Sequence, residues 1–156
     1  AENLLKFNSD KTAIITSGEG QEEEHISFKK LRTRVALLTS ALRKLGIRRG
    51  DRVAGYLPSG SLAVEAMLAT ASLGAIWSST SPDFGALGVL DRFVQINPRV
   101  IFSVNAVTYN GKVHNHMTKL KEVVEGLPNL ENVIVLPFVG SKDEVNLREI
   151  PKRFTP

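Results

Sequence analysis

Apolar residues recur in this chain first at helical spacing and then in short strand-like runs. The helical set is Leu31, Val35, Leu38, Leu42 and Leu45, which fall on one face of a helix. Ser27, just before this set, is a residue type that caps helix N-termini. Gly46, just after it, is typical of a left-handed C-terminal cap. The pattern therefore predicts one amphipathic helix between these two residues.

The segment before that helix is β-prone at Lys11–Thr16 and again at His25–Phe28. Between them lies the polar, glycine-bearing stretch Ser17–Glu24, which predicts a hairpin with a long acidic loop. Its glycines also invite comparison with a phosphate-binding loop. Because glutamates follow them instead of a lysine and a helix, a turn is favoured over a phosphate site.

After the first helix, short apolar strands alternate with helices. The predicted strands are Val53–Leu57, Ala75–Trp77, Val100–Val104 and Val133–Leu136. The predicted helices are Leu62–Leu73, Ala86–Ile96 and Met117–Val124. The first of these is apolar nearly all round except at Glu65, and Pro58–Ser61 is expected to cap it. This alternation predicts an α/β fold, with a parallel sheet covered by helices.

Two polar loops follow strands of this predicted sheet, Ser78–Gly85 and Asn105–Asn115. Ligands of parallel α/β sheets bind beyond the carboxyl ends of the strands, so these loops are the candidate site. In the second loop, Gly111 permits close approach and Lys112 adds a charge, which suits a phosphate or an adenine edge. An ordinary exposed turn is the alternative interpretation.

Other candidate chemistry is poorly supported. Ser78, Ser79 and Ser81 have no nucleophile-elbow motif around them, so hydrogen bonding within the loop is favoured over a catalytic role. His114 and His116 have the spacing of a two-histidine metal pair, but no third ligand is evident nearby. We therefore interpret both as surface polar residues and expect no catalytic residue and no metal ligand here.

The charge and composition narrow the class of protein further. The net charge is +4, but basic and acidic residues are mixed, and the denser basic stretch Lys29–Arg52 fits a solvated helix face better than a nucleic-acid site. No apolar run approaches the roughly 20 residues of a membrane span. The absence of cysteine excludes disulfides and thiolate chemistry and fits a reducing compartment. The ends of the chain suggest a segment cut from a longer protein.

Two stretches carry a resemblance to a known family. The string from Tyr56 to Phe102, which includes SSTSPDFG, and the later VTYNGKVHNHMTKL are similar to the adenylate-forming acyl-CoA synthetases. The phrases SSTSPDFG and YNGK resemble the acetoacetyl branch of that superfamily. The similarity runs from AENLL to about Pro137. It implies that residues 1–156 are a single partial domain, the early segment of the N-terminal adenylation domain, with a poorly patterned polar tail over residues 138–156.

The resemblance also implies a reaction for the parent enzyme. The carboxylate of acetoacetate attacks the α-phosphate of ATP, supplied with Mg, and the thiol of CoA then displaces AMP from the acyl-adenylate. The family's phosphate loop, TSGTTGxPK, does not occur in this sequence. The chain by itself is thus expected to be inactive, with the rest of the polypeptide, including a mobile C-terminal domain, as its partner. A cytosolic location, no nucleic acid and no membrane span are implied as well.

The resemblance places the nucleotide end of CoA between the two loops. Pro82, Asp83 and Phe84 would line one side, and Tyr109, Gly111 and Lys112 the other. The acetyl branch has glycines where this chain has Pro82 and Asp83, and arginines where it has Tyr109 and Lys112. A lysine keeps the charge for the 3′-phosphate but loses the bidentate fork of arginine. Asp83 is expected to face away from the phosphates or to meet Lys112.

One further departure lies in the superfamily's first core motif, which has a glutamate where this chain has Lys30. The change removes half of a capping box and is expected to cost under about 1 kcal/mol of stability. Two alternatives to the ligase remain open at this point. One is a stand-alone module that binds CoA or a nucleotide without catalysis, and the other is a purely structural module.

Overall fold

The computed structural model describes residues 1–141, 145 and 147–151. The chain divides into two compact units, Ala1–Asp51 with Ser59–Trp77, and Arg52–Pro58 with Ser78–Pro156. The single partial domain over residues 1–156 stays a prediction. In the predicted tail over residues 138–156, positions 142–144, 146 and 152–156 lie outside the described residues, and a short 3-10 helix, η2, covers Leu147–Glu149.

The first unit holds an antiparallel hairpin and two helices. Its elements are β1 (Thr12–Gly18), β2 (Gln21–Ser27), α1 (Phe28–Lys44) and α2 (Ser61–Ser72). The predicted long acidic loop at Ser17–Glu24 is wrong, since only Glu19 and Gly20 separate the two strands. Most glutamates of β2 are exposed, so their charges stay hydrated and do not oppose strand pairing.

Both predicted caps of α1 are confirmed. The side chain of Ser27 accepts a hydrogen bond of 3.2 Å from the backbone N–H of Lys30. At the other end, Gly46 has a φ of 77°, and the N–H groups of Gly46 and Ile47 both return to carbonyls of the last turn. That pair of bonds is the Schellman motif, which satisfies carbonyls that the helix leaves open. At α2, by contrast, the cap residue Gly60 contributes no side-chain hydrogen bond.

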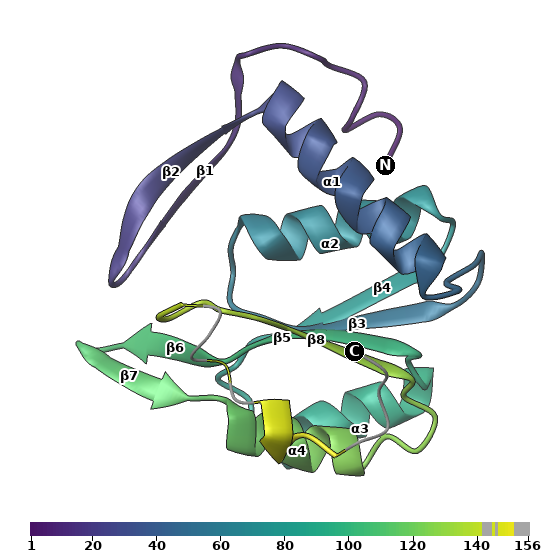
Figure 1. Ribbon diagram of the computed structural model, residues 1–156, viewed down its shortest axis with the longest axis vertical. Helices are drawn as coiled ribbons and strands as arrows, with labels where there is room; N and C mark the ends of the chain where they lie inside the picture. The colour runs from purple at the N-terminus through teal and green to yellow at the C-terminus, as the bar shows by residue number, and fades with distance from the viewer. Residues whose placement is uncertain (142–144, 146, 152–156) are drawn as a thin grey trace. The chain divides into compact units, whose positions relative to one another are not determined.

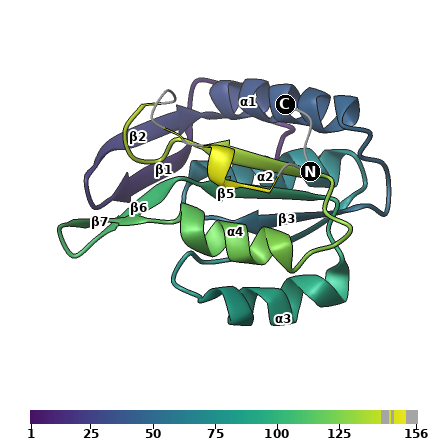
Figure 2. The same cartoon turned by 60° about the horizontal axis from the view of Figure 1, so that its bottom comes forward.

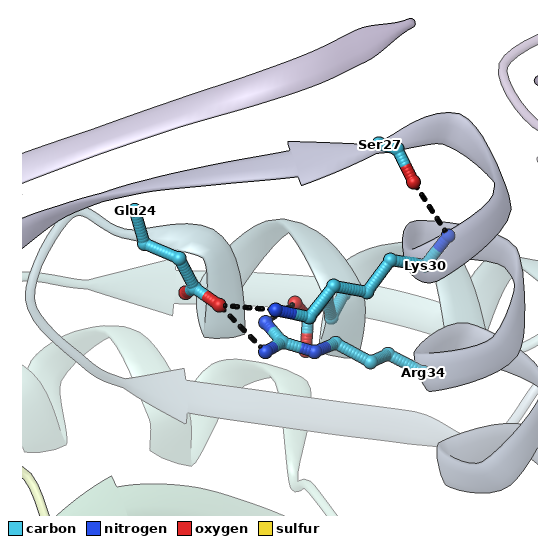
Figure 3. Close-up of polar contacts among 5 residues, drawn as sticks. Glu24, Ser27, Lys30 and Arg34 are labelled. Carbon is cyan, nitrogen blue, oxygen red and sulfur yellow. Dashed lines mark hydrogen bonds and ion pairs between the residues drawn. The ribbon is translucent and has the colours of Figure 1, made fainter. Parts of the chain in front are cut away.

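A buried glutamate joins α2 to α1 and β2. Arg34 of α1 donates to Glu24 at 2.7 Å and to Glu65 at 3.1 Å, and the side chain of Glu65 is only 8% exposed. Lys30 also donates to Glu24, at 2.8 Å (Figure 3). These bonds, that of Lys30 first, lower the pKa of Glu24, while the bond to Glu24 raises the pKa of Arg34. The lysine that breaks the capping box thus bonds to β2 instead.

The second unit is built on a sheet with the strand order β4-β3-β5-β8. Its strands are β3 (Arg52–Tyr56), β4 (Ile76–Thr80), β5 (Val100–Val104) and β8 (Asn132–Leu136), and β5 is parallel to both β3 and β8. The last residues of β4, Ser78–Thr80, belong to this unit. The predicted α/β class with a parallel sheet is confirmed.

Two helices of this unit, α3 (Ala86–Ile96) and α4 (Met117–Glu125), cover the same face of the sheet (Figures 1 and 2). Their inward residues form one core with β3 and β5. Its largest members are Tyr56, Phe93, Ile101, Leu120 and Leu127, each at most 1% exposed. Since β3 and β5 end beside α4, this core places their carboxyl ends next to the start of that helix.

The loop after β4 is shorter than predicted. The predicted strand Ala75–Trp77 is β4, which continues to Thr80, so Ser78–Thr80 belong to the strand and not to the loop. The backbone N–H of Leu57 donates to the carbonyl of Thr80 at 3.1 Å. A strand at a sheet edge is defined by this backbone pairing, which polar side chains do not prevent.

The predicted polar loop Asn105–Asn115 is wrong as well. It contains a hairpin of β6 (Ala106–Tyr109) and β7 (Lys112–Asn115). Asn110 and Gly111 form the turn with φ angles of 51° and 71°. Two positive φ angles match the twist of antiparallel strands, and Asn-Gly is the sequence that adopts them most readily. The dipeptide Asn110-Gly111 is therefore the sequence signal from which this hairpin could have been predicted.

Candidate functional site

A groove of about 730 Å³ lies in the second unit, at the loops that follow β4 and β5. It is lined by Pro82, Asp83, Val107, Tyr109, Val113, His114, Asn115, His116 and Lys119. The two loops proposed from the sequence therefore do meet at one site. Three of the six predicted residues, Pro82, Asp83 and Tyr109, line the groove, whereas Phe84, Gly111 and Lys112 are outside its lining.

The loop after β4 is held in place through its backbone. The hydroxyl of Tyr56, at the end of β3, donates to the carbonyl of Phe84 at 2.5 Å. The ammonium of Lys119, in α4, donates to the carbonyl of Pro82 at 3.1 Å. Donors from two different elements thus hold the two residues that flank Asp83.

Within this loop, Ser81 orients the side chain of Asp83. The Ser81 hydroxyl donates to Oδ2 of Asp83 at 2.8 Å and accepts from the backbone N–H of Asp83 at 3.3 Å. Asp83 thus bonds to Ser81 within its own loop, which is not the pairing with Lys112 that was one of the two expected arrangements. Phe84 lies against α3 instead, where the guanidinium of Arg92 is 4.7 Å from its ring centroid.

The β6–β7 hairpin supplies an aromatic surface to the same groove. The ring of Tyr109 is 6.4 Å from that of His114, at an interplanar angle of 52°, and Tyr109 is 69% exposed. Tyr109 pairs directly with Lys112, and Val107 pairs with His114. Because side chains alternate along a strand, Tyr109, Lys112, Val107 and His114 share one face of the hairpin. Lys112 thus lies at the edge of the groove, although it does not line it.

His116 was missed by the sequence interpretation. It was expected at the surface with His114, but it is 2% exposed at the N-cap of α4, while His114 is exposed. Its Nε2 atom is buried and has no hydrogen-bond partner among the described residues. Burial first, and the charge of Lys119 second, lower the pKa of His116 to about 4, so the ring is neutral near pH 7. The neighbouring Asn115 takes the capping role by accepting from the N–H of Met117 at 2.8 Å.

Tyr56, the donor to the loop, also remains protonated. Burial, followed by the charges of Glu122 and Asp83, raises its pKa to about 12. The neutral ring of His116 thus lines the groove, and the neutral phenol of Tyr56 packs against this ring from the core. The lining also carries the carboxylate of Asp83, the ammonium of Lys119 and the rings of Tyr109 and His114. The arrangement suits binding of a ligand that offers both a flat ring and hydrogen-bond donors.

Within residues 1–141, 145 and 147–151, no three histidine, aspartate or glutamate side chains gather in a way that would hold a metal ion. Over the same residues, no helix has the length and apolar character needed to cross a membrane.

Comparison with known proteins identifies the class. A parallel sheet with loops forming a groove beyond its carboxyl ends fits the family whose model matches residues 2–153, described as AMP-binding enzyme. The chain belongs to this family. Within it, the chain is 58% identical over 153 residues to acetoacetyl-CoA synthetase of Macaca fascicularis, and 60% identical over 153 residues to that of Danio rerio.

Both alignments cover 97% of this chain and 23% of the relative, so the chain spans about a quarter of the length of these proteins. The structure is similar to that of acetoacetyl-CoA synthetase from Streptomyces lividans, with a TM-score of 0.83 and 41% identity. That match covers 93% of this chain and 21% of the other chain. The resemblance drawn from SSTSPDFG and YNGK is thus confirmed at the level of the whole segment.

Proposed function

We propose that this chain is the early segment of the adenylation domain of an acetoacetate–CoA ligase. In the first step, the acetoacetate carboxylate attacks the α-phosphate of Mg-bound ATP, forming acetoacetyl-adenylate and releasing pyrophosphate. In the second, the CoA thiol attacks the acyl carbon, its proton is lost and AMP leaves. The observation that carries the proposal is the 55–60% identity to acetoacetyl-CoA synthetases over 97% of the chain.

We further propose that the groove takes the nucleotide end of CoA. Supporting this are the convergence of Pro82, Asp83 and Tyr109 on one groove and the position of Lys112 at its edge. A ring surface beside a cation suits a purine nucleotide, because the ring stacks on the aromatic face and the phosphate pairs with the ammonium. Gly111 and Lys112 then serve from the hairpin turn, and Phe84 supports the loop from the side of α3.

The activity is tested on the full-length polypeptide that carries this chain. Release of AMP and pyrophosphate is measured with ATP, CoA and one of three acids: acetoacetate, acetate or a long-chain fatty acid. We expect the highest kcat/KM with acetoacetate and dependence of AMP release on CoA. A preference for acetate or for the long-chain acid would refute the substrate assignment. The absence of AMP formation with every acid would refute the ligase.

A further inference from the structure

The proposed binding of the nucleotide end of CoA does not by itself explain why the carboxylate of Asp83 lines the groove. If the groove takes the nucleotide end of CoA, a negative charge beside it is unfavourable for phosphate. Asp83 nevertheless lines the groove and is exposed. Ser81 occupies its Oδ2 atom, and no hydrogen bond to Oδ1 joins it to any described residue. An ionised carboxylate has about four lone-pair positions on its two oxygens, so Asp83 keeps acceptor capacity for a ligand, including the whole of Oδ1.

The donors on the nucleotide end of CoA are few. They are the exocyclic N6 amine of adenine and the 2′-hydroxyl of the ribose, since phosphates offer only acceptors near neutral pH. The 2′-hydroxyl lies next to the 3′-phosphate, which a carboxylate repels. The N6 amine is neutral, donates two hydrogens and lies on the base edge remote from the phosphates. Of the available groups, the amine therefore matches Asp83 best.

The hairpin residues that line the same groove support this assignment. Tyr109 and His114 present an exposed pair of rings on which a base can stack. Lys112 is directly paired with Tyr109 at the turn and offers a cation for phosphate. Asp83 lies on the other loop, with its neighbours Pro82 and Phe84 held by Lys119 and Tyr56. A base on Tyr109 then has its phosphate toward the lysine and its amine free for the carboxylate.

We propose that Asp83 accepts a hydrogen bond from the N6 amine of the CoA adenine. This inference rests on the proposed function of the groove. Ser81 acts as a positioning residue, because its hydroxyl holds Oδ2 and leaves Oδ1 for the amine. The acetoacetyl and acetyl branches of the superfamily then differ at this position, because the glycine of the acetyl branch has no side chain that could accept this hydrogen bond.

The test compares CoA with an analogue in which unsubstituted purine replaces adenine, so that a hydrogen atom replaces the 6-amino group and the base has no N–H donor. The full-length ligase is assayed for kcat/KM with each thiol. A charged hydrogen bond predicts a wild-type preference for CoA of about tenfold or more. In Asp83→Asn, Ser81 still holds the amide oxygen and the NH₂ group cannot accept from the amine, so the preference disappears. In Asp83→Gly no side-chain acceptor is present, and the preference disappears as well.

Asp91→Asn is the matched control, because Asp91 is an exposed aspartate of α3 outside the groove lining. It is expected to keep the wild-type preference. If Asp83→Asn and Asp83→Gly also keep it, the role of Asp83 is refuted. The Tyr109→Ala variant distinguishes a failure of the Asp83 proposal from a failure of the proposal that the groove binds CoA. An unchanged KM for CoA in Tyr109→Ala would refute CoA binding here, whereas a raised KM would leave the groove proposal standing.

Discussion

The imidazole of His116 lies edge-to-face against the phenol of Tyr56, with ring centroids 4.3 Å apart and an interplanar angle of 66°. The contact joins the end of β3 to the start of α4 directly beneath the groove. Because the same Tyr56 donates its hydroxyl to the carbonyl of Phe84, the pair links the core to the loop that carries Asp83. The shape of the groove therefore depends on two buried rings that both remain uncharged.

The burial of His116 predicts a specific pH dependence. Its pKa is about 4 in the folded state and 6.5 without burial, so between these values the unfolded state binds the proton and the folded state does not. Above about pH 6.5 the free energy of unfolding carries no penalty from His116. As the pH falls toward 4, protonation of the unfolded state lowers the free energy of unfolding, by at most about 3 kcal/mol. In denaturant unfolding of the full-length protein, the stability advantage of the wild type over His116→Asn should shrink across this window. His114→Asn, which removes an exposed histidine of the same groove, is the control variant measured alongside.

Tyr56→Phe removes one hydrogen bond while keeping the ring. We expect a loss of about 1 kcal/mol in the free energy of unfolding, since the carbonyl of Phe84 loses its donor. The freed loop should also raise the KM for CoA, by about twofold if half of that energy is lost on binding. Tyr109→Phe is the control for stability, because Tyr109 is exposed and should change it by less than about 0.5 kcal/mol. Equal stability of Tyr56→Phe and wild type would contradict the role of this bond.

Lys112→Glu reverses the charge at the edge of the groove. We expect it to raise the KM for CoA about fivefold at low salt, with a smaller effect at high salt, because an exposed ammonium is screened by ions. With 3′-dephospho-CoA the effect should be much smaller, since the phosphate that Lys112 attracts is missing. Lys121→Glu makes the same charge change on the exposed side of α4 and should leave both KM values near wild type. Equal effects of Lys112→Glu on the two thiols would contradict pairing with the 3′-phosphate.

Arg34 and Lys30 both bond to Glu24, but their removal should have different costs. Arg34→Met leaves the buried carboxylate of Glu65 without its cation and is expected to destabilise the protein by about 3 kcal/mol. Lys30→Met removes a half-exposed ion pair and should cost at most about 1 kcal/mol. Denaturant midpoints of the two variants measure the difference. Similar losses would mean that Glu65 does not depend on Arg34.

Residue type and spacing along the chain were sufficient to predict the elements that have a regular apolar pattern or a clear cap residue. The predicted ranges Ala86–Ile96 and Val100–Val104 coincide with α3 and β5, and the caps at Ser27 and Gly46 were read from residue type alone. Helical spacing and cap residues are short-range features, so neighbouring residues determine them. The β6–β7 hairpin was also within reach, because Asn110 and Gly111 form the preferred turn, but their polar surroundings favoured a loop.

What the sequence by itself determined is the α/β class, most element positions and the two loops that meet at the groove. Only the tertiary structure decided that His116 is buried, since its burial comes from Tyr56 on a distant strand. It also decided that Lys119 and Tyr56 hold the loop around Asp83. The reason is physical: periodicity reports which face of an element is apolar, whereas side-chain partners depend on how elements from remote parts of the chain meet.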